Sequence, residues 1–165
     1  MDSCIEKKEC ICQKYGNRCN ECINELQIRD SGKSIKLTIK NNEKAISAII
    51  DKCIITDNNP KCDCIFLFNG NRKISFLVEL KGFGEIEKAF KQLSYTKNSR
   101  IEYEKIIECF YRLDNKAINE KFIIVTNGKL NHYEKEKYEN EHNIRVTDIL
   151  VSEATQTIPD LRKYI

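Results

Sequence analysis

Hydrophobic and polar residues alternate along much of the chain after residue 33 in patterns that predict β-strands. Residues 34–40 (SIKLTIK) alternate polar with apolar positions, which is typical of a strand with one buried face. Residues 62–68 (CDCIFLF) and 73–80 (KISFLVEL) are rich in aromatic and β-branched side chains. The Asn69-Gly70 pair between them is a strong hairpin signal. We therefore expect two adjacent antiparallel strands in this part of the chain.

Helical spacing is clearest directly after these strands. Residues 85–95 (EIEKAFKQLSY) bring Ile86, Ala89, Phe90 and Leu93 onto one face, which predicts an amphipathic helix. The remaining patterns predict a short helix over 43–50 leading into a strand over 53–56, a helix over 101–113, a buried strand over 121–126, a charged helix over 133–141 and a last strand over 144–150. This order predicts an α+β fold with a mixed central sheet flanked by helices.

Length and composition limit the class of protein. The chain has 165 residues, about one domain's worth, with 41% hydrophobic and 32% charged residues, which is unlike both a disordered tail and a membrane protein. The longest uncharged run, residues 64–71, is far shorter than the ~20 residues of a membrane-spanning helix. Asp2 and Glu6 stand where a secretory signal would be basic and then apolar. We therefore expect a cytoplasmic protein without a membrane partner.

The cysteines divide the chain near Ser31-Gly32-Lys33. Five of the nine lie before this point, so we predict a Cys-rich module over residues 1–33 and a second domain over residues 34–165. In a reducing cytosol these cysteines are expected to be thiols or metal ligands. The remaining cysteines in apolar surroundings are interpreted as buried packing residues, namely Cys53, Cys62, Cys64 and Cys109.

Four of the N-terminal cysteines have the spacing of a metal site. Cys10, Cys12, Cys19 and Cys22 form C-x-C-x6-C-x2-C, and two close thiolate pairs can surround a tetrahedral Zn²⁺. An iron–sulfur cluster also takes four thiolates, and unligated thiols are a third interpretation. Because four cysteines leave no open position for a catalytic water, such a module would be structural or would bind a protein partner.

Charge is concentrated in one segment. The net charge is only +3, but residues 61–100 contain eight basic and four acidic residues. Phosphate contacts from Lys and Arg position a nucleic acid on a protein. The candidates in or beside this segment's predicted strands and helix are Arg72, Lys73, Lys88, Lys91 and Arg100.

Asp63, Glu79 and Lys81 are the candidate catalytic residues. Alternate strand residues share a face, so Glu79 and Lys81 should project to one side and Leu80 to the other. A hairpin around Asn69-Gly70 places Asp63 across from residue 76 or 77, with Glu79 about 7–10 Å away. We expect the two carboxylates and the Leu80 carbonyl to hold Mg²⁺ or Mn²⁺, with Lys81 stabilising anionic charge. Such a set suits phosphodiester hydrolysis.

This pattern resembles the PD-(D/E)xK nuclease superfamily, which includes restriction endonucleases and RecB-like nucleases. The segments KCDCIFLF and FLVELKG match its motif, with Cys62 in place of the usual proline before Asp63. Gln92 and Tyr95 in KQLSY are similar to the Gln and Tyr that RecB-like members use beside the active site, at a spacing one residue shorter. The resemblance thus implies a catalytic role for both. The resemblance spans about residues 43–125.

The resemblance implies a restriction-endonuclease-like core, a metal-dependent nuclease acting on DNA, with RNA as another possible substrate, and a further acidic residue. Glu43 and Asp51 are both open for that last role. An alternative is a binding or regulatory module of a defence or repair complex that keeps the nuclease fold without its chemistry. A cysteine-based redox or metal-storage protein is a third interpretation.

Overall fold

The protein is described by a computed structural model, which places residues 8–15, 18–20, 26–112, 117–153 and 156–165. Within these residues a seven-stranded mixed sheet runs in the order β2-β1-β5-β6-β7-β8-β9. Strands β2 to β7 pair antiparallel, whereas β7, β8 and β9 are parallel. The strands are β1 (Ile11–Tyr15), β2 (Arg18–Asn20), β5 (Lys44–Ile49), β6 (Cys64–Asn69), β7 (Lys73–Leu80), β8 (Asn119–Thr126) and β9 (Asp148–Val151).

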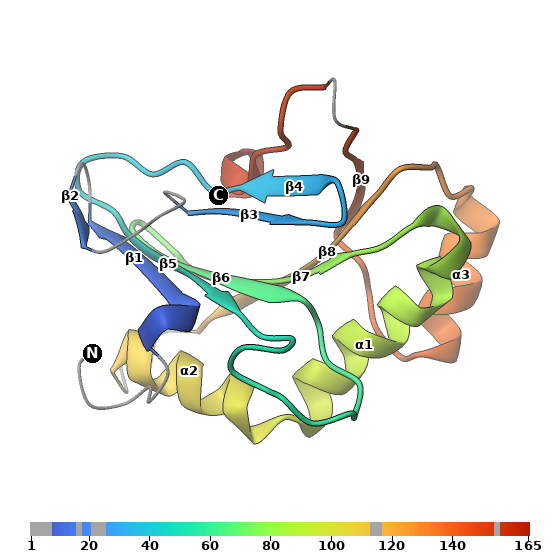
Figure 1. The fold of residues 1–165 in the computed structure, drawn as a ribbon, viewed down its shortest axis with the longest axis horizontal. Coiled ribbons are helices and arrows are strands. Elements are labelled where there is room, and N and C mark those ends of the chain that lie inside the picture. The colour runs from blue at the N-terminus through green and yellow to red at the C-terminus, as the bar shows by residue number, and fades with distance from the viewer. Residues whose placement is uncertain (1–7, 16–17, 21–25, 113–116, 154–155) are drawn as a thin grey trace.

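Helices cover one face of this sheet (Figure 1). They are α1 (Ile86–Ser99), α2 (Ile101–Tyr111) and α3 (His132–Glu141). The chain also has short 3-10 turns, η1 (Lys8–Cys10), η2 (Phe83–Glu85) and η3 (Leu161–Tyr164), of which η3 lies on the other side of the sheet, where Leu161 joins the cluster of the β3–β4 hairpin. Ile86, Ala89, Phe90 and Leu93 of α1 are buried against the sheet, as their spacing predicted. None of the helices in the described ranges is long and apolar enough to cross a membrane.

A two-stranded hairpin covers the opposite face (Figure 1). It consists of β3 (Gln27–Asp30) and β4 (Lys33–Lys36), and its Ile28 and Ile35 join a second apolar cluster with Phe66, Phe68 and Phe76 of the large sheet. With layers on both sides, all eight residues of β7 are buried. The predicted α+β class with a mixed sheet flanked by helices is therefore confirmed.

Two predictions about the chain's organisation were wrong. Residues 43–50 do not form a helix: β5 pairs with β1 on one edge and β6 on the other, and residues 53–56 lie in a turn rather than a strand. A short apolar run does not separate a buried strand from a helix by periodicity. The boundary at residue 33 also fails, because it cuts the β3–β4 hairpin and because β1 and β2 belong to the main sheet.

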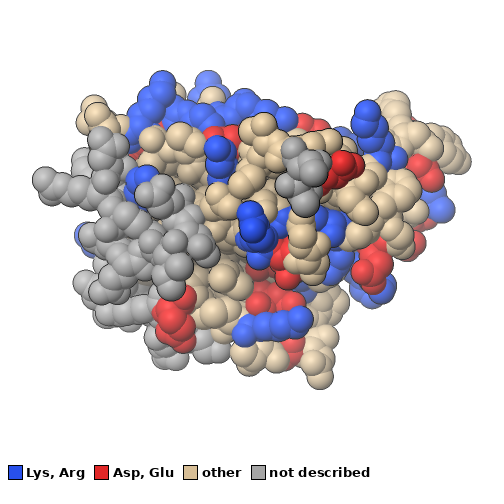
Figure 2. Space-filling model, turned by 45° about the horizontal axis from the view of Figure 1, so that its top comes forward, with Lys and Arg blue, Asp and Glu red and all other residues tan. Residues whose placement is uncertain are grey.

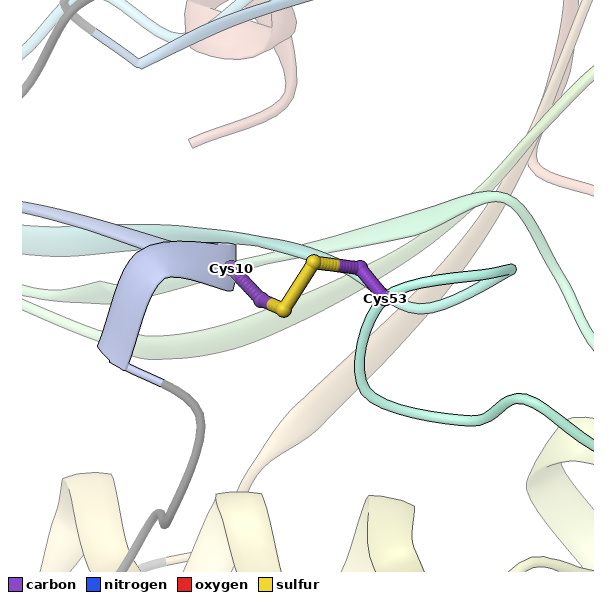
Figure 3. The surroundings of a disulfide bond; sticks show 2 residues. All are labelled: Cys10 and Cys53. Atoms are coloured by element: carbon purple, nitrogen blue, oxygen red, sulfur yellow. A yellow bond between two sulfur atoms is a disulfide. The ribbon is translucent and has the colours of Figure 1, made fainter.

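The cysteine pairing differs from the predicted thiolate site. Cys10, at the end of η1, is bonded to Cys53 in the turn after β5 (Figure 3). Cys12 is also disulfide-bonded. Two of the four predicted zinc ligands are therefore not thiolates here, while Cys22 lies outside the described residues. Cys53 is a bonding residue rather than a packing residue.

The other cysteines follow the prediction. Cys62, Cys64 and Cys109 are buried thiols. Burial raises the pKa of both Cys62 and Cys64, and the nearby carboxylates raise it further.

The protein is alkylated at once to trap free thiols and is then digested without reduction. We expect the digest to contain a peptide in which Cys10 is bonded to Cys53. Because this bond joins residues 43 positions apart, its reduction should lower the free energy of unfolding by about 3–4 kcal/mol. Mass spectrometry and urea titration measure the two effects. One equivalent of bound zinc or iron together with alkylated Cys10 and Cys53 would contradict this pairing.

Candidate metal centre and phosphate-binding surface

The register of the β6–β7 hairpin brings the two candidate carboxylates together. Cys64 pairs with Val78 and Asn69 with Lys73, so the residue before β6, Asp63, lies opposite Glu79. The expected register, which placed Asp63 across from residue 76 or 77, was wrong. The connection is a three-residue loop over 70–72, closed by Gly70 N–H donating to the Arg72 carbonyl at 3.1 Å, rather than a two-residue Asn-Gly turn.

Asp63 and Lys81 each contact the carboxylate of Glu79, Asp63 through its backbone and Lys81 through its side chain. The backbone N–H of Asp63 donates to Glu79 Oε2 at 3.0 Å, and the backbone N–H of Leu80 donates to Asp63 Oδ2 at 2.6 Å. Lys81 Nζ lies 2.9 Å from Glu79 Oε1 as an ion pair. The predicted constellation is therefore assembled at the end of the hairpin away from its loop, with distances shorter than the sequence indicated.

Burial makes this a costly place for negative charge. Glu79 is 0% exposed, and its Oε1 has no hydrogen bond of good geometry despite the nearby ammonium. Burial, followed by the charge of Asp63, raises the pKa of Glu79 well above its usual range. Burial also raises the pKa of Asp63. The arrangement is one that an additional cation would stabilise.

Lys81 is held in its charged form. Its side chain is 21% exposed. Burial alone would lower the pKa of this ammonium, but the charges of Glu79 and Asp63 outweigh burial and raise it. Lys81 is therefore protonated at neutral pH and supplies a fixed positive charge beside the carboxylates.

The two carboxylates fit a hard divalent cation. Mg²⁺ and Mn²⁺ prefer oxygen ligands, and Mg²⁺ is commonly bound through only one or two carboxylates with the rest of its shell from water. The observation that bears on the fit is the buried Oε1 of Glu79, which makes no hydrogen bond of good geometry although Lys81 Nζ lies 2.9 Å away as an ion pair. No described contact tests the predicted Leu80 carbonyl ligand.

Of the two open acidic candidates, the structure places Asp51 beside the site. The backbone N–H groups of Ile50 and Asp51 both donate to the Asp63 carbonyl, at 2.8 and 3.3 Å. Glu43 instead forms an ion pair with Arg162. It stands next to Lys44, which pairs with Asn69 at the end of β6 that is far from Asp63. Glu43 is therefore excluded from this site by its position.

Gln92 connects helix α1 to the segment that carries Asp63. Its side-chain Nε2 donates to the Lys61 carbonyl at 2.8 Å, two residues before Asp63. Thr96, one turn further along α1, accepts from the Cys62 N–H at 2.7 Å. Gln92 is thus a positioning residue, and Thr96 is a second one that sequence reasoning missed because an isolated threonine in a helix carries no signal.

Tyr95 is not brought to the carboxylates by any contact among the described residues. Its ring lies under the Arg100 guanidinium, 5.6 Å from the ring centroid. The predicted catalytic role of Tyr95 therefore has no geometric support.

A surface hollow lies beside the candidate metal centre. Its volume is about 340 Å³. The residues that line it are Asp51, Asn58, Asn59, Pro60, Lys61, Lys88, Lys91 and Gln92. Lys88 and Lys91, both predicted phosphate contacts, are exposed on its α1 side, and Lys88 is paired with Glu85 at 2.6 Å. Asp63, Glu79 and Lys81 do not line the hollow, which reaches this part of the chain through Asp51, Lys61 and Gln92.

The other predicted phosphate contacts lie elsewhere. Arg72 and Lys73 line a separate hollow at the loop end of the hairpin, about 20 Å along β7 from Glu79. Lys73 is buried, with its ammonium 5.3 Å from the centroid of the Tyr111 ring. Arg72 and Lys73 therefore lie away from the carboxylates, because an excess of charge in a sequence window does not specify the end of a strand.

Arg100 has a structural role instead of a phosphate-binding one. Its guanidinium donates two hydrogen bonds to Asp57, at 2.7 and 2.6 Å, and one to the Pro60 carbonyl at 3.2 Å. Arg100 is 8% exposed. Arg100 therefore holds the segment before Asp63 against the C-terminal end of α1. Its positive charge is paired with the Asp57 carboxylate.

Basic residues do not form one broad field on the face shown in Figure 2. Lys and Arg side chains run along one edge, with Asp and Glu side chains between and below them. This agrees with the small net charge of +3. Any phosphate attraction on this face is local.

The chain matches no protein-family model, no curated protein and no solved structure. The site is therefore interpreted from its own geometry.

We expect Glu79→Gln to stabilise the protein at neutral pH by about 0.5–2 kcal/mol, a common size for stabilising substitutions. A carboxyl group whose pKa is raised by folding contributes stability below its unfolded pKa, near 4.5, and loses it as the pH rises through the folded pKa. The neutral amide avoids the cost of the buried charge. Urea titrations between pH 4.5 and 8 should show the advantage shrinking toward low pH.

The matched control is Glu136→Gln, an exposed position in α3, which should leave the free energy of unfolding unchanged. A large loss of stability in Glu79→Gln at neutral pH would mean that the Lys81 pair outweighs burial.

Proposed function

We propose that this protein is a metal-dependent nuclease that hydrolyses phosphodiester bonds of DNA. The observation that carries the proposal is the meeting of Asp63, Glu79 and Lys81 at one end of the β6–β7 hairpin, through contacts of 2.6–3.0 Å. A hollow with two exposed lysines adjoins the same segment. Two carboxylates, one ammonium and a phosphate-binding wall are the parts that metal-assisted phosphodiester hydrolysis requires.

Asp63 and Glu79 would hold Mg²⁺ or Mn²⁺, with the Leu80 carbonyl as the proposed third protein ligand. When bound, the cation polarises a phosphoryl oxygen and lowers the pKa of water in its coordination shell. It also offsets the negative charge that burial makes costly at Glu79. The carboxylates keep their positions through the backbone N–H groups of Asp63 and Leu80, so the donor set is ordered in advance.

Lys81 acts as a charge stabiliser. Because its pKa is raised, its ammonium stays protonated at neutral pH and is not a base. A fixed cation beside the reacting phosphate favours the additional negative charge of the transition state. Gln92 and Arg100 hold the segment that leads into Asp63 and so keep the first carboxylate in register with the second.

The chain's topology supports the proposed restriction-endonuclease-like core. Strands β5, β6 and β7 form an antiparallel meander, and helices α1 and α2 then connect to the parallel strand β8. The PD-(D/E)xK resemblance implies an Asp at the start of one strand, Glu-x-Lys at the end of the next and a helix after it. Asp63, Glu79, Lys81 and α1 occur in that order and at those places.

A second candidate function is a binding or regulatory module that retains the fold without chemistry. The observation that favours it is the complete burial of Glu79, whose carboxylate already contacts Lys81 and Asp63. Titration with Mg²⁺ or Mn²⁺ separates the two candidates: a module would show no binding at millimolar metal while retaining a nucleic-acid or protein partner.

We expect purified protein with Mn²⁺ to cleave plasmid or single-stranded DNA, and Asp63→Asn, Glu79→Gln and Lys81→Met each to lower the rate at least about 100-fold. Loss of one group that stabilises transition-state charge commonly has an effect of this size. The measurement is the initial rate of cleavage on gels. Glu136→Gln, made and purified in the same way, should cleave at the wild-type rate.

Equal cleavage by wild type and by Asp63→Asn would identify the activity as a contaminant and overturn the proposal. Loss of activity together with loss of Mn²⁺ binding in Asp63→Asn, measured by calorimetry, would support a direct role in metal binding.

We also expect Lys91→Ala to weaken DNA binding and to reduce the slope of log K against log salt by about 0.7–1, the contribution of one neutralised phosphate. Fluorescence anisotropy at several salt concentrations measures it. Lys105→Ala, an exposed position on α2, is the matched control and should keep the wild-type slope. An unchanged slope in Lys91→Ala would remove the hollow from the DNA-binding surface.

A further inference from the structure

Phe83 is an exposed aromatic residue beside the candidate metal centre. Phe83 is the first residue of η2, the turn that directly precedes α1. It lies two residues after Lys81 and is 43% exposed. Ile49, Ile101 and Tyr133 are the other large apolar side chains that are comparably exposed in the described ranges. Single exposed apolar residues are common, so exposure alone carries no inference about Phe83.

The way Phe83 is held distinguishes it. Its backbone N–H donates to the side-chain Oδ1 of Asn127 at 3.0 Å. Its ring lies against Gly128, where an added Cβ would be 2.4 Å from Cδ2 and 2.5 Å from Cγ of Phe83. The ring therefore occupies a position that only a glycine at 128 leaves open. An exposed apolar ring fixed in this way has already lost much of the conformational freedom that ligand binding would otherwise restrict.

The pairing of β7 with β8 places this ring at the same end of these strands as the carboxylates. Leu80 of β7 lies opposite Val125 of β8, and the Lys81 N–H donates to the Val125 carbonyl at 2.9 Å. Asn127 and Gly128 follow directly at the end of β8. Phe83 is two residues from Lys81, a backbone span of at most about 7 Å. A nucleotide whose phosphate lies near Lys81 thus has its base within reach of the ring.

We propose that Phe83 stacks on an unpaired nucleobase next to the scissile phosphate, so that the substrate is single-stranded nucleic acid or a frayed duplex end. This inference rests on the proposed nuclease function. An aromatic face binds a base whose own face is free, and in an intact duplex both faces of an internal base are covered by its neighbours. Stacking on an aromatic ring accepts any base, so the contact selects strand state rather than sequence.

The absence of tryptophan from the chain offers a direct test. Phe83→Trp introduces a single indole at the proposed stacking position. In buffer with EDTA, where no metal-dependent cleavage occurs, a short single-stranded oligonucleotide should quench its fluorescence saturably, and a blunt-ended duplex of the same length, with G·C-rich ends and no loop, should not. Tyr133→Trp places an indole at another exposed aromatic position and should show no saturable quenching.

Anisotropy with the same oligonucleotides gives a second, independent measurement. Phe83→Ala and Phe83→Leu should each weaken single-strand binding by about 5- to 150-fold, the loss of one base–aromatic stack. Phe83→Tyr should retain it. Tyr133→Ala is the matched control and should bind as the wild type does.

Wild-type affinity in Phe83→Ala would overturn the stacking role. Wild-type affinity in Phe83→Leu would also overturn it, because it would mean that the contact is apolar and needs no aromatic ring. Equal quenching of Phe83→Trp by the duplex would overturn the strand selectivity. Neither measurement depends on cleavage. If single-strand binding depends on Phe83 and no cleavage occurs with Mn²⁺, the proposed nuclease function fails alone; if Asp63-dependent cleavage occurs and Phe83→Ala is neutral, the stacking inference fails alone.

Discussion

The carboxyl group of Glu79 lies at the end of a strand whose two faces are both covered, where burial and the neighbouring Asp63 disfavour its charged form. Helices bury one face of β7 and the β3–β4 hairpin buries the other. A carboxylate in such a place must be neutralised, hydrogen-bonded or bound to a cation. One backbone N–H and one ammonium reach it. A cation bound beside Glu79, as we propose, would offset more of this buried negative charge.

The segment between β5 and β6 is the second determinant, because it decides where Asp63 lies. Lys61 is buried and contacts the carbonyls of Asp57 and Asn59, so the segment is held from within. Arg100 and Thr96 fasten it to α1 from outside. The Cys10–Cys53 bond ties its beginning to η1, the turn before β1. A segment without regular structure is thereby held at several points along its length.

Much of the fold follows from local patterns, and the exceptions have identifiable causes. The β6 and β7 strands and helix α1 are evident from apolar runs and helical spacing, because burial on both faces leaves strong patterns. The register was not predictable, because Asn69-Gly70 favours a two-residue turn and the hairpin uses a longer loop. Strand β5 was misread, since its pairing with β1 and β6 depends on distant residues.

The candidate site was predictable in its acidic and basic residues but not in its surroundings. Glu-x-Lys after a buried strand is visible in one sequence, whereas the partner of Arg100 lies 43 positions away and requires the folded chain. The cysteine spacing suggested a metal module because Cys53, the actual partner of Cys10, stands in another part of the chain.

Cys62 and Cys64 flank Asp63 in sequence, and their sulfurs are sealed in the interior. Since the thiolate is the reactive form, and burial holds both groups as neutral thiols, electrophiles and peroxides have no access to them in the native state. The rate at which an alkylating reagent modifies them would therefore measure how often the β6–β7 hairpin opens locally beside Asp63.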